Sequence, residues 1–337
     1  MYHLQLTNAA FEGRNSVYLL GAGDDAAPTT LVDTGIATPD VESELRDALA
    51  ARGTSFAAVD QVLLTHWHHD HAGLAGAIQA DGDATVYVHE ADAPIVARDA
   101  AAVDAMEATQ AACLDEWGMP ADEQAELNDF LGTHDDLQGE PADVTPLADG
   151  DTVDLGSVEA EVVHLPGHAA GLAAYAFERD GRREAFVGDA VLPKYTPNVG
   201  GADVRVDRPL QGYLDSLRRV EALDLDRAWP GHRGPIFAPT ERARDIADHH
   251  DERTERVVDV VRDRGPVTAW AVSAALFGDL HAIHILHGPG EAYAHLDHLA
   301  RHGAVERDGD EYALVDDPDV DALFPDPGID RVVEPTE

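Results

Sequence analysis

Four candidate metal ligands fall within six consecutive residues of this sequence. The stretch 65–73 reads Thr-His-Trp-His-His-Asp-His-Ala-Gly, and its four candidate ligands are His66, His68, Asp70 and His71. It follows the short apolar run 62–64, which indicates a buried strand. Residues i and i+2 of a chain that leaves a strand point the same way, so His66 and His68 can share one metal, whereas the other two can turn toward a second. Imidazole and carboxylate ligands suit zinc, and also iron or manganese.

Three more residues of the same types follow strand-like segments later in the chain. His168 and His232 each come directly after a Pro-Gly pair that ends an apolar run, and Asp189 ends the apolar stretch 185–188. A carboxylate at a strand end, beside a permissive glycine, can bridge two ions. Each of the three by itself is an ordinary turn or cap. Their order after the nonapeptide favours a single metal centre built from distant parts of the chain.

The combined pattern resembles the metallo-β-lactamase superfamily, in its glyoxalase-II-like branch. The five motifs that carry the resemblance are Leu-Val-Asp-Thr-Gly at 31–35, the stretch 65–71, His168, Asp189 and His232. The match runs from about Asn15 to Ile236. It implies an α/β fold, the αββα sandwich of that family, with a dinuclear site at the edge of the sheets. True β-lactamases of the superfamily lack the bridging aspartate, which this sequence has.

The resemblance also implies a role for each motif residue. It divides them into two sets of three ligands and one bridge: His66, His68 and His168 for one ion, Asp70, His71 and His232 for the other, and Asp189 between them. Asp33 would orient a ligand histidine rather than bind metal. The implied cofactor is a pair of Zn²⁺ ions, with iron or manganese as alternatives.

The chemistry that such a site permits is hydrolysis by a metal-bridging hydroxide, with Asp70 and Asp189 as its catalytic carboxylates. The first hypothesis is a dinuclear hydrolase of a small thioester or ester. The alternatives are a metal-dependent single-strand endoribonuclease, a mononuclear iron persulfide dioxygenase, and a non-catalytic binding module. Lys194, the one lysine of the chain, stands beside Tyr195 just past Asp189. This pair is either a contact for an anionic group of a small-molecule substrate or an ordinary surface loop.

Acidic residues dominate the composition. The chain has 65 Asp and Glu against 23 Lys and Arg, a formal net charge of −42. Because this acidity is spread along the whole sequence, it favours a salt-adapted, halophilic protein over an acidic block for a basic partner. It argues against binding to nucleic acid or to an anionic membrane. One cysteine, no signal sequence and no apolar run of about 18 residues predict a cytoplasmic protein.

The sequence predicts three parts and a tail. Residues 1–238 form the catalytic domain, with an alanine-rich helical insert at 90–141 that is expected either to lie over the metal site or to cover the sheet. Residues 239–315 show the order helix, helix, helix, hairpin, which resembles the winged-helix module of the LACTB2-like subgroup. Its third helix is not basic, so we expect a packing or dimerisation module and a homodimer rather than a nucleic-acid reader. Residues 316–337 are expected to be a disordered acidic tail.

Overall fold

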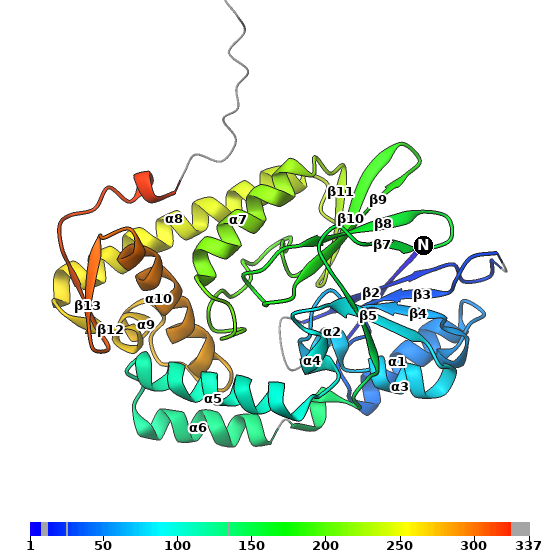
Figure 1. The fold of residues 1–337 in the computed structure, drawn as a ribbon, viewed down its shortest axis with the longest axis horizontal. Helices are drawn as coiled ribbons and strands as arrows, with labels where there is room; N and C mark the ends of the chain where they lie inside the picture. Colours follow the sequence, from blue (N-terminus) through cyan, green and yellow to red (C-terminus); the bar gives the residue numbers. More distant parts are fainter. Residues whose placement is uncertain (8–12, 25, 134, 325–337) are drawn as a thin grey trace, which may run out of the picture.

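The computed structural model describes residues 1–7, 13–24, 26–133 and 135–324, and its centre is a pair of β-sheets (Figure 1). The first sheet has the strand order β1 (Tyr2–Leu6), β2 (Asn15–Leu20), β3 (Thr30–Val32), β4 (Gln61–Leu63), β5 (Thr85–His89) and β6 (Val144–Leu147). The second has the order β11 (Arg227–Pro230), β10 (Arg182–Gly188), β9 (Ala173–Arg179), β8 (Glu159–His164) and β7 (Thr152–Asp154). The pairs β3–β4, β4–β5, β5–β6 and β10–β11 are parallel.

Aromatic side chains fill the space between the two sheets. Tyr18 of β2 lies 5.0 Å from Phe186 of β10 and 5.7 Å from Trp229 of β11, measured between ring centroids. Tyr175 and Phe177 of β9 belong to the same buried cluster. Large rings of this kind bury much apolar surface each, so the contact between the sheets is rigid and holds their edges in a fixed relation.

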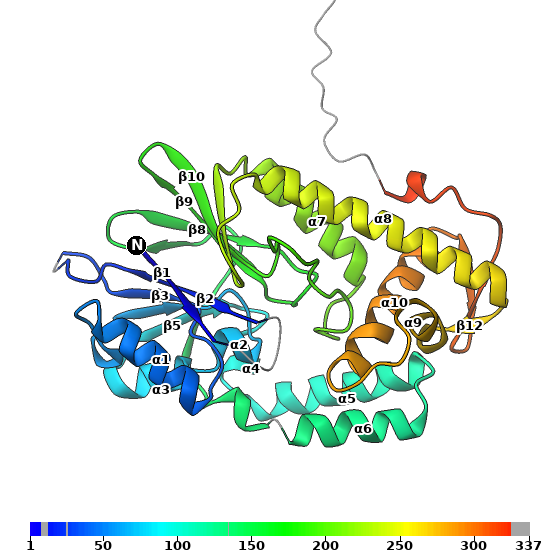
Figure 2. The same ribbon diagram turned by 180° about the vertical axis from the view of Figure 1, so that it is seen from behind.

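Helices cover the outer face of each sheet, as Figures 1 and 2 show. The first sheet carries α1 (Pro39–Ala50) and α3 (Ala75–Gly82), and the second carries α7 (Pro209–Ala222) and α8 (Pro239–Arg264). In α1 the Thr38 hydroxyl caps the Val41 amide, and the buried residues Val41, Leu45 and Leu49 recur every fourth position. That spacing places all three on one face of a helix. The observed layers confirm the predicted mixed α/β architecture of two sheets between helices.

The helical insert and the C-terminal part of the chain share one hydrophobic core. The insert contains α4 (Ala93–Val96), α5 (Ala100–Glu116) and α6 (Ala121–Gly132). The C-terminal unit continues from α8 through β12 (Val267–Thr268), α9 (Ala269–Phe277), α10 (His284–Arg301), β13 (Val305–Asp308) and β14 (Glu311–Leu314). Leu114 and Trp117 of the insert are buried in the same cluster as Val257 and Leu296. The buried faces of α5 and α6 thus pack on the C-terminal unit. Whether the insert also lies over the metal site stays a prediction.

The end of the chain departs from the predicted disordered tail in part. Residues 316–324 are described, Val320 is buried, and Asp321–Leu323 form a short 3₁₀ helix. The expectation of disorder was therefore wrong for 316–324, because Val320 and Phe324 find apolar partners in the core of the C-terminal unit. Residues 325–337 lie outside the described part of the chain.

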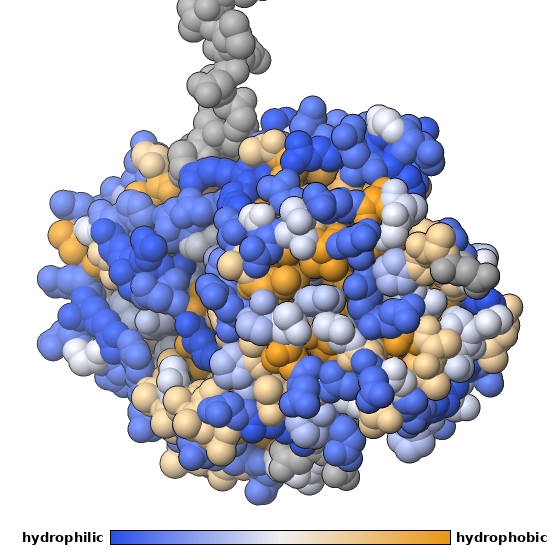
Figure 3. All heavy atoms as spheres, turned by 45° about the vertical axis from the view of Figure 1, so that its right-hand side comes forward, coloured by the Kyte–Doolittle hydropathy of each residue, from blue (hydrophilic) through white to orange (hydrophobic). Residues whose placement is uncertain are grey.

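The surface agrees with the acidic composition. Hydrophilic residues cover most of the face in Figure 3, with apolar patches between them. Among the helices of the described residues, none is both long enough and apolar enough to cross a membrane.

Candidate metal centre

The seven ligand-type residues all follow the ends of strands. Four of them occupy the loop after β4 and the short helix α2 (His69–Ala72), and the others follow β8, β10 and β11. Parallel strands end at the same edge of a sheet, so the segments after β3 and β4 meet, as do those after β10 and β11. The two sheets are joined at this edge, because the Ser16 amide donates to Gly231 O at 2.7 Å and the Tyr175 hydroxyl donates to Leu64 O at 2.7 Å.

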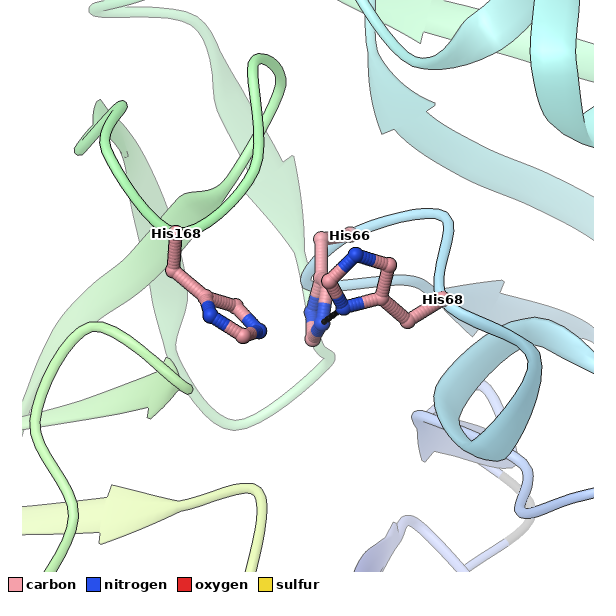
Figure 4. Close-up of side chains that lie close together, drawn as sticks. All are labelled: His66, His68 and His168. Atoms are coloured by element: carbon pink, nitrogen blue, oxygen red, sulfur yellow. Dashed lines mark hydrogen bonds between the residues drawn. The ribbon is translucent and has the colours of Figure 1, made fainter. Parts of the chain in front are cut away.

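The fold brings the seven residues into one place. Their ligand atoms form three groups, each within 4.8 Å: His66, His68 and His168; Asp70, His71 and His232; and His66, His71 and Asp189. Figure 4 shows the first group, in which the three imidazole rings point toward a common centre. Asp189 lies between the two sets, since Oδ1 is 3.7 Å from His71 Nε2 and Oδ2 is 3.7 Å from His168 Nε2.

Hydrogen bonds on the outer side of each ring determine which nitrogen faces the centre. A carbonyl oxygen can only accept, so His168 donates from Nδ1 to Asn198 O at 2.8 Å and His68 donates from Nε2 to Ala202 O at 3.0 Å. His71 places Nδ1 3.0 Å from Oδ2 of Asp33 and donates to that carboxylate. In its neutral form, each of these three rings therefore carries its lone pair on the inner nitrogen.

The contact between His66 and His68 is one that a cation would stabilise. Thr65 donates its hydroxyl proton to Asp33 at 2.9 Å, so the Thr65 oxygen accepts from His66 Nδ1 at 3.0 Å. His66 Nε2 then has a lone pair, and it lies 2.9 Å from the lone pair of His68 Nδ1. Two lone pairs at this separation repel each other unless a proton or a metal lies between them. The donor set thus fits a metal ion at this point.

Buried polar atoms without a hydrogen-bond partner indicate that the rest of the centre also fits a metal ion. His71 Nε2, His168 Nε2 and Asp189 Oδ1 are buried and have no hydrogen-bond partner among the described residues. A buried polar atom left without a partner costs about 1–3 kcal/mol. Bound metal would satisfy all three at once, and imidazole with carboxylate is a donor set of the zinc class. His232 differs in orientation: its Nε2 faces Asp189 at 3.3 Å, and its Nδ1 is the orphaned atom.

The buried charges shift the ionisation of the ligands in opposite directions. Burial lowers the pKa of His71, but the carboxylates of Asp70, Asp189 and Asp33 outweigh it and raise the pKa to about 10. Burial raises the pKa of Asp189, yet the neighbouring His232 and His71 hold that pKa well below its ordinary value. Burial, with the His168 charge, lowers the pKa of His68 to about 3. Metal binding to the protein must therefore displace a proton from His71.

Asp33 lies beside His71, one of the candidate ligands. Its carboxylate accepts from the Thr65 amide at 2.8 Å as well as from the Thr65 hydroxyl and His71. The residue is buried and its φ of 57° lies in the left-handed region, which costs energy for a residue other than glycine. A strained backbone conformation persists where surrounding contacts hold it in place. At Asp33, the three hydrogen bonds of its carboxylate hold the residue in this conformation.

Several residues near the centre carry no signal in the sequence. Asn15, at the start of β2, donates from Nδ2 to Asp70 Oδ2 at 3.1 Å. Asp92 accepts from the Trp67 amide at 3.0 Å, and Asp203 accepts from the Trp67 indole N–H at 3.0 Å. Arg205 pairs with both carboxylates, at 2.7 and 2.6 Å. These partners are far from 65–71 in the sequence, so local reasoning cannot find them.

Lys194 and Tyr195 lie at the surface. Tyr195 is 42% exposed, and both Lys194 Nζ and Arg233 Cζ lie against its ring, 5.1 and 4.8 Å from the centroid. Among the described residues neither cation has a carboxylate within 4.0 Å, whereas most arginines here have one. Arg233 follows His232 directly in sequence. The surface next to His232 is therefore locally basic on a strongly acidic protein.

Comparison with known proteins adds an independent observation. A family model described as the Metallo-beta-lactamase superfamily matches residues 10–232. The chain is similar to "Probable metallo-hydrolase YqjP" of Bacillus subtilis (strain 168), with 29% identity over 281 residues, 82% of this chain and 86% of that protein. It is also similar to "Atrochrysone carboxyl ACP thioesterase" of Aspergillus fumigatus, with 24% identity over 280 residues, 79% of this chain and 51% of that protein.

A solved structure gives the corresponding result for the fold. The crystal structure of metallo-beta-lactamase family protein TTHA1429 from Thermus thermophilus superposes with a TM-score of 0.79 at 30% sequence identity. The superposition covers 93% of this chain and 98% of that one, so it includes most of the helical insert and most of the C-terminal unit.

Proposed function

We propose that this chain, which belongs to the metallo-beta-lactamase superfamily and is a metal-dependent hydrolase of that fold, binds two metal ions. We further propose that its substrate is a small thioester or ester. One observation carries the proposal: Asp189 lies between two complete sets of three ligand-type residues. A site for a single ion would not need the second set.

The proposed ligands are those that the sequence predicts. His66, His68 and His168 hold one ion, and Asp70, His71 and His232 hold the other, with Asp189 between them. When bound, two divalent ions of the zinc class lower the pKa of a shared water and polarise the carbonyl oxygen of a substrate. Zinc is the metal we propose, because the set contains five imidazoles and two carboxylates.

The protein residues orient the reaction. Asn15 donates to Oδ2 of Asp70 and fixes the direction of that carboxylate, which accepts a hydrogen bond from the attacking water. The water oxygen forms the new bond to the acyl carbon, the carbon–sulfur or carbon–oxygen bond breaks, and the water's proton ends on the leaving thiolate or alkoxide. The products are a carboxylic acid and a thiol or alcohol.

The basic surface beside His232 supports a substrate with an anionic group. Lys194 and Arg233 flank the exposed ring of Tyr195 and have no carboxylate partner within 4.0 Å among the described residues. A relative named as a thioesterase supports a thioester as the reacting group. We also assign residues 239–315 to the winged-helix modules of the LACTB2-like subgroup, because the order α8, β12, α9, α10, β13, β14 matches that pattern.

The test is a substrate panel on purified protein in high KCl, with metal content measured by elemental analysis. We expect two zinc ions per chain and hydrolysis of anionic thioesters that chelation abolishes and zinc restores. One iron per chain with persulfide oxidation, or cleavage of single-stranded RNA, would overturn the proposal. Lys194→Met should raise KM for an anionic thioester several-fold and leave a neutral analogue unaffected, whereas Lys194→Arg should behave like the wild type.

A further inference from the structure

One loop joins half of the metal centre to the C-terminal unit. We propose that helix α10 positions the His66–His68–His168 set through residues 197–203, with Asn198 and Glu291 as the positioning residues. The inference rests on the proposed dinuclear function, because it assigns a second role to the C-terminal unit within the same site.

The loop provides the outer hydrogen bonds of two ligand histidines. His168 donates to the backbone carbonyl of Asn198 at 2.8 Å, and His68 donates to the backbone carbonyl of Ala202 at 3.0 Å. These two bonds select the nitrogen that each ring presents to the metal and fix the direction of the ring. A displacement of this one loop would therefore disturb two of the three ligands of the same ion.

The side chain of Asn198 attaches the loop to α10. Its Nδ2 donates to the His287 carbonyl at 3.0 Å and to Glu291 Oε2 at 2.9 Å, and its Oδ1 accepts from the Gly201 amide at 3.1 Å. Both amide hydrogens and the carbonyl oxygen are thus used. The same residue contacts a ligand histidine with its backbone and the C-terminal helix with its side chain.

Glu291 is in turn held by the adjoining helix. Its Oε1 accepts from Arg253 of α8 at 2.7 Å, and both side chains are only 12% exposed. A charge-assisted bond that is shielded from solvent is stronger than an exposed one. Glu291 also lies near His250 and His295, in a group that could by composition hold a cation. The guanidinium of Arg253 disfavours a cation there, so the geometry points to Glu291 as the anchor of Asn198.

Close backbone contact makes the loop follow the helix. A Cβ at Gly200 would collide with Gly290 O, and a Cβ at Gly201 would lie 2.6 Å from His287 Cα. The loop and α10 therefore approach at a distance that only glycine permits. Very little space remains between them, so the loop cannot shift independently of the helix.

The other half of the centre has different supports. Asp33 holds His71, and Asn15 holds Asp70, both from the first sheet. The inference therefore predicts a selective effect: loss of the Asn198 side chain should weaken one of the two ions and leave the other.

The test is zinc titration of the full-length, metal-stripped protein against a chromophoric chelator. For Asn198→Ala we expect one of the two dissociation constants to rise by about 10- to 100-fold, as is usual when an outer partner of a ligand is removed. The second constant should stay within about threefold of the wild type. Asn198→Asp, which repels Glu291, should act in the same way, and Glu291→Gln, which still accepts from Asn198, should act more weakly. The absorption bands of bound cobalt should change for one ion only.

Asp297→Asn is the matched control, because Asp297 lies on α10 and pairs with Arg301 outside the loop. It should keep both dissociation constants.

If the wild type binds fewer than two ions, the proposed function fails. If the wild type binds two and both Asn198 variants keep both constants, this inference fails while the function stands. Equal weakening of both ions, with a melting temperature lowered to the same extent in metal-free protein, would show a general loss of packing and would also overturn it. A third bound zinc that Glu291→Gln removes would instead assign Glu291 to a separate site.

Discussion

The Nδ1 atom of His71 lies 3.0 Å from Oδ2 of Asp33, and the same carboxylate accepts from the amide and hydroxyl of Thr65. Because Thr65 also contacts His66, one buried carboxylate directly after β3 determines the orientation of histidines from both proposed ligand sets. Asp33 thus links the two candidate ligand sets without belonging to either of them.

Asp33→Ala should leave the Thr65 amide and His71 Nδ1 without acceptors. We expect the affinity for zinc to fall by about 10- to 100-fold, as measured by competition with a chelator. Asp60→Ala is the control, because Asp60 accepts a backbone N–H from Thr29 at 2.7 Å just before β4, at the opposite end of that strand. Equal affinities in the two variants would contradict the role of Asp33.

Gly231→Ala should block the centre. An added Cβ would collide with Asp189 Oδ1 and lie 2.5 Å from His71 Cε1. Overpacking of this kind costs about 1–3 kcal/mol of stability, and here it acts on ligand atoms. We expect loss of bound metal and of hydrolysis. Gly234→Ala, where an added Cβ meets nothing within 4 Å, should behave like the wild type in elemental analysis and in activity.

Asp189→Ala should remove the carboxylate between the two ligand sets. Metal content by elemental analysis should fall below two ions per chain, and hydrolysis should be lost. Asp207→Ala removes a carboxylate that is 83% exposed and should keep both. Full metal content in Asp189→Ala would count against its proposed bridging role.

Stability should fall in acid because of a buried histidine in α8. Burial, together with the charges of His249 and Arg253, lowers the pKa of His250 from its ordinary value of 6.5 to about 3. Between these values the unfolded chain binds a proton that the folded chain does not, so the free energy of unfolding decreases as the pH falls from 6.5 toward 3. One proton gives a slope of about 1.4 kcal/mol per pH unit.

His250→Gln should make this slope shallower by up to one proton, as measured by urea unfolding of metal-free protein at constant KCl. The packing around His250 includes Tyr213, Glu291 and a second buried histidine, His295, so His295→Gln should also reduce the slope. His281→Gln changes a side chain that is 80% exposed and should leave the slope as it is. A slope unchanged in both buried variants would exclude these histidines as its source.

Salt should stabilise the protein. At a formal charge of −42, lowering the salt concentration lengthens the screening distance, from about 3 Å at 1 M to about 10 Å at 0.1 M, and exposes carboxylate repulsion. We expect melting temperatures to rise steadily across a KCl series. A neutral osmolyte at the same osmolality should raise them less. A flat or falling trend with KCl would show that the acidity is not an adaptation to salt.

Local patterns determined most of the elements and the candidate residues. The spacing of Val41, Leu45 and Leu49 specifies α1, because a helix places every fourth residue on one face. The apolar run before His66 ends a strand in the structure as well. No local pattern specifies the short strand β6, because Val144–Leu147 lacks a regular alternation of apolar and polar residues. The seven motif residues can bind metal through their own side chains, so the sequence alone identifies them by residue type and order.

Tertiary structure alone decided what surrounds those residues. Asn198 and Ala202 act on His168 and His68 through backbone carbonyls, and every residue has a carbonyl, so no residue type marks them in a sequence. Leu114 and Trp117 of the insert pack on the C-terminal unit, because apolar side chains can pack against any complementary core and only the folded chain shows which core is near them. Glu291 and Asn198 are 93 residues apart in the sequence. Their hydrogen bond depends on how α10 packs against the loop, which no local sequence pattern specifies.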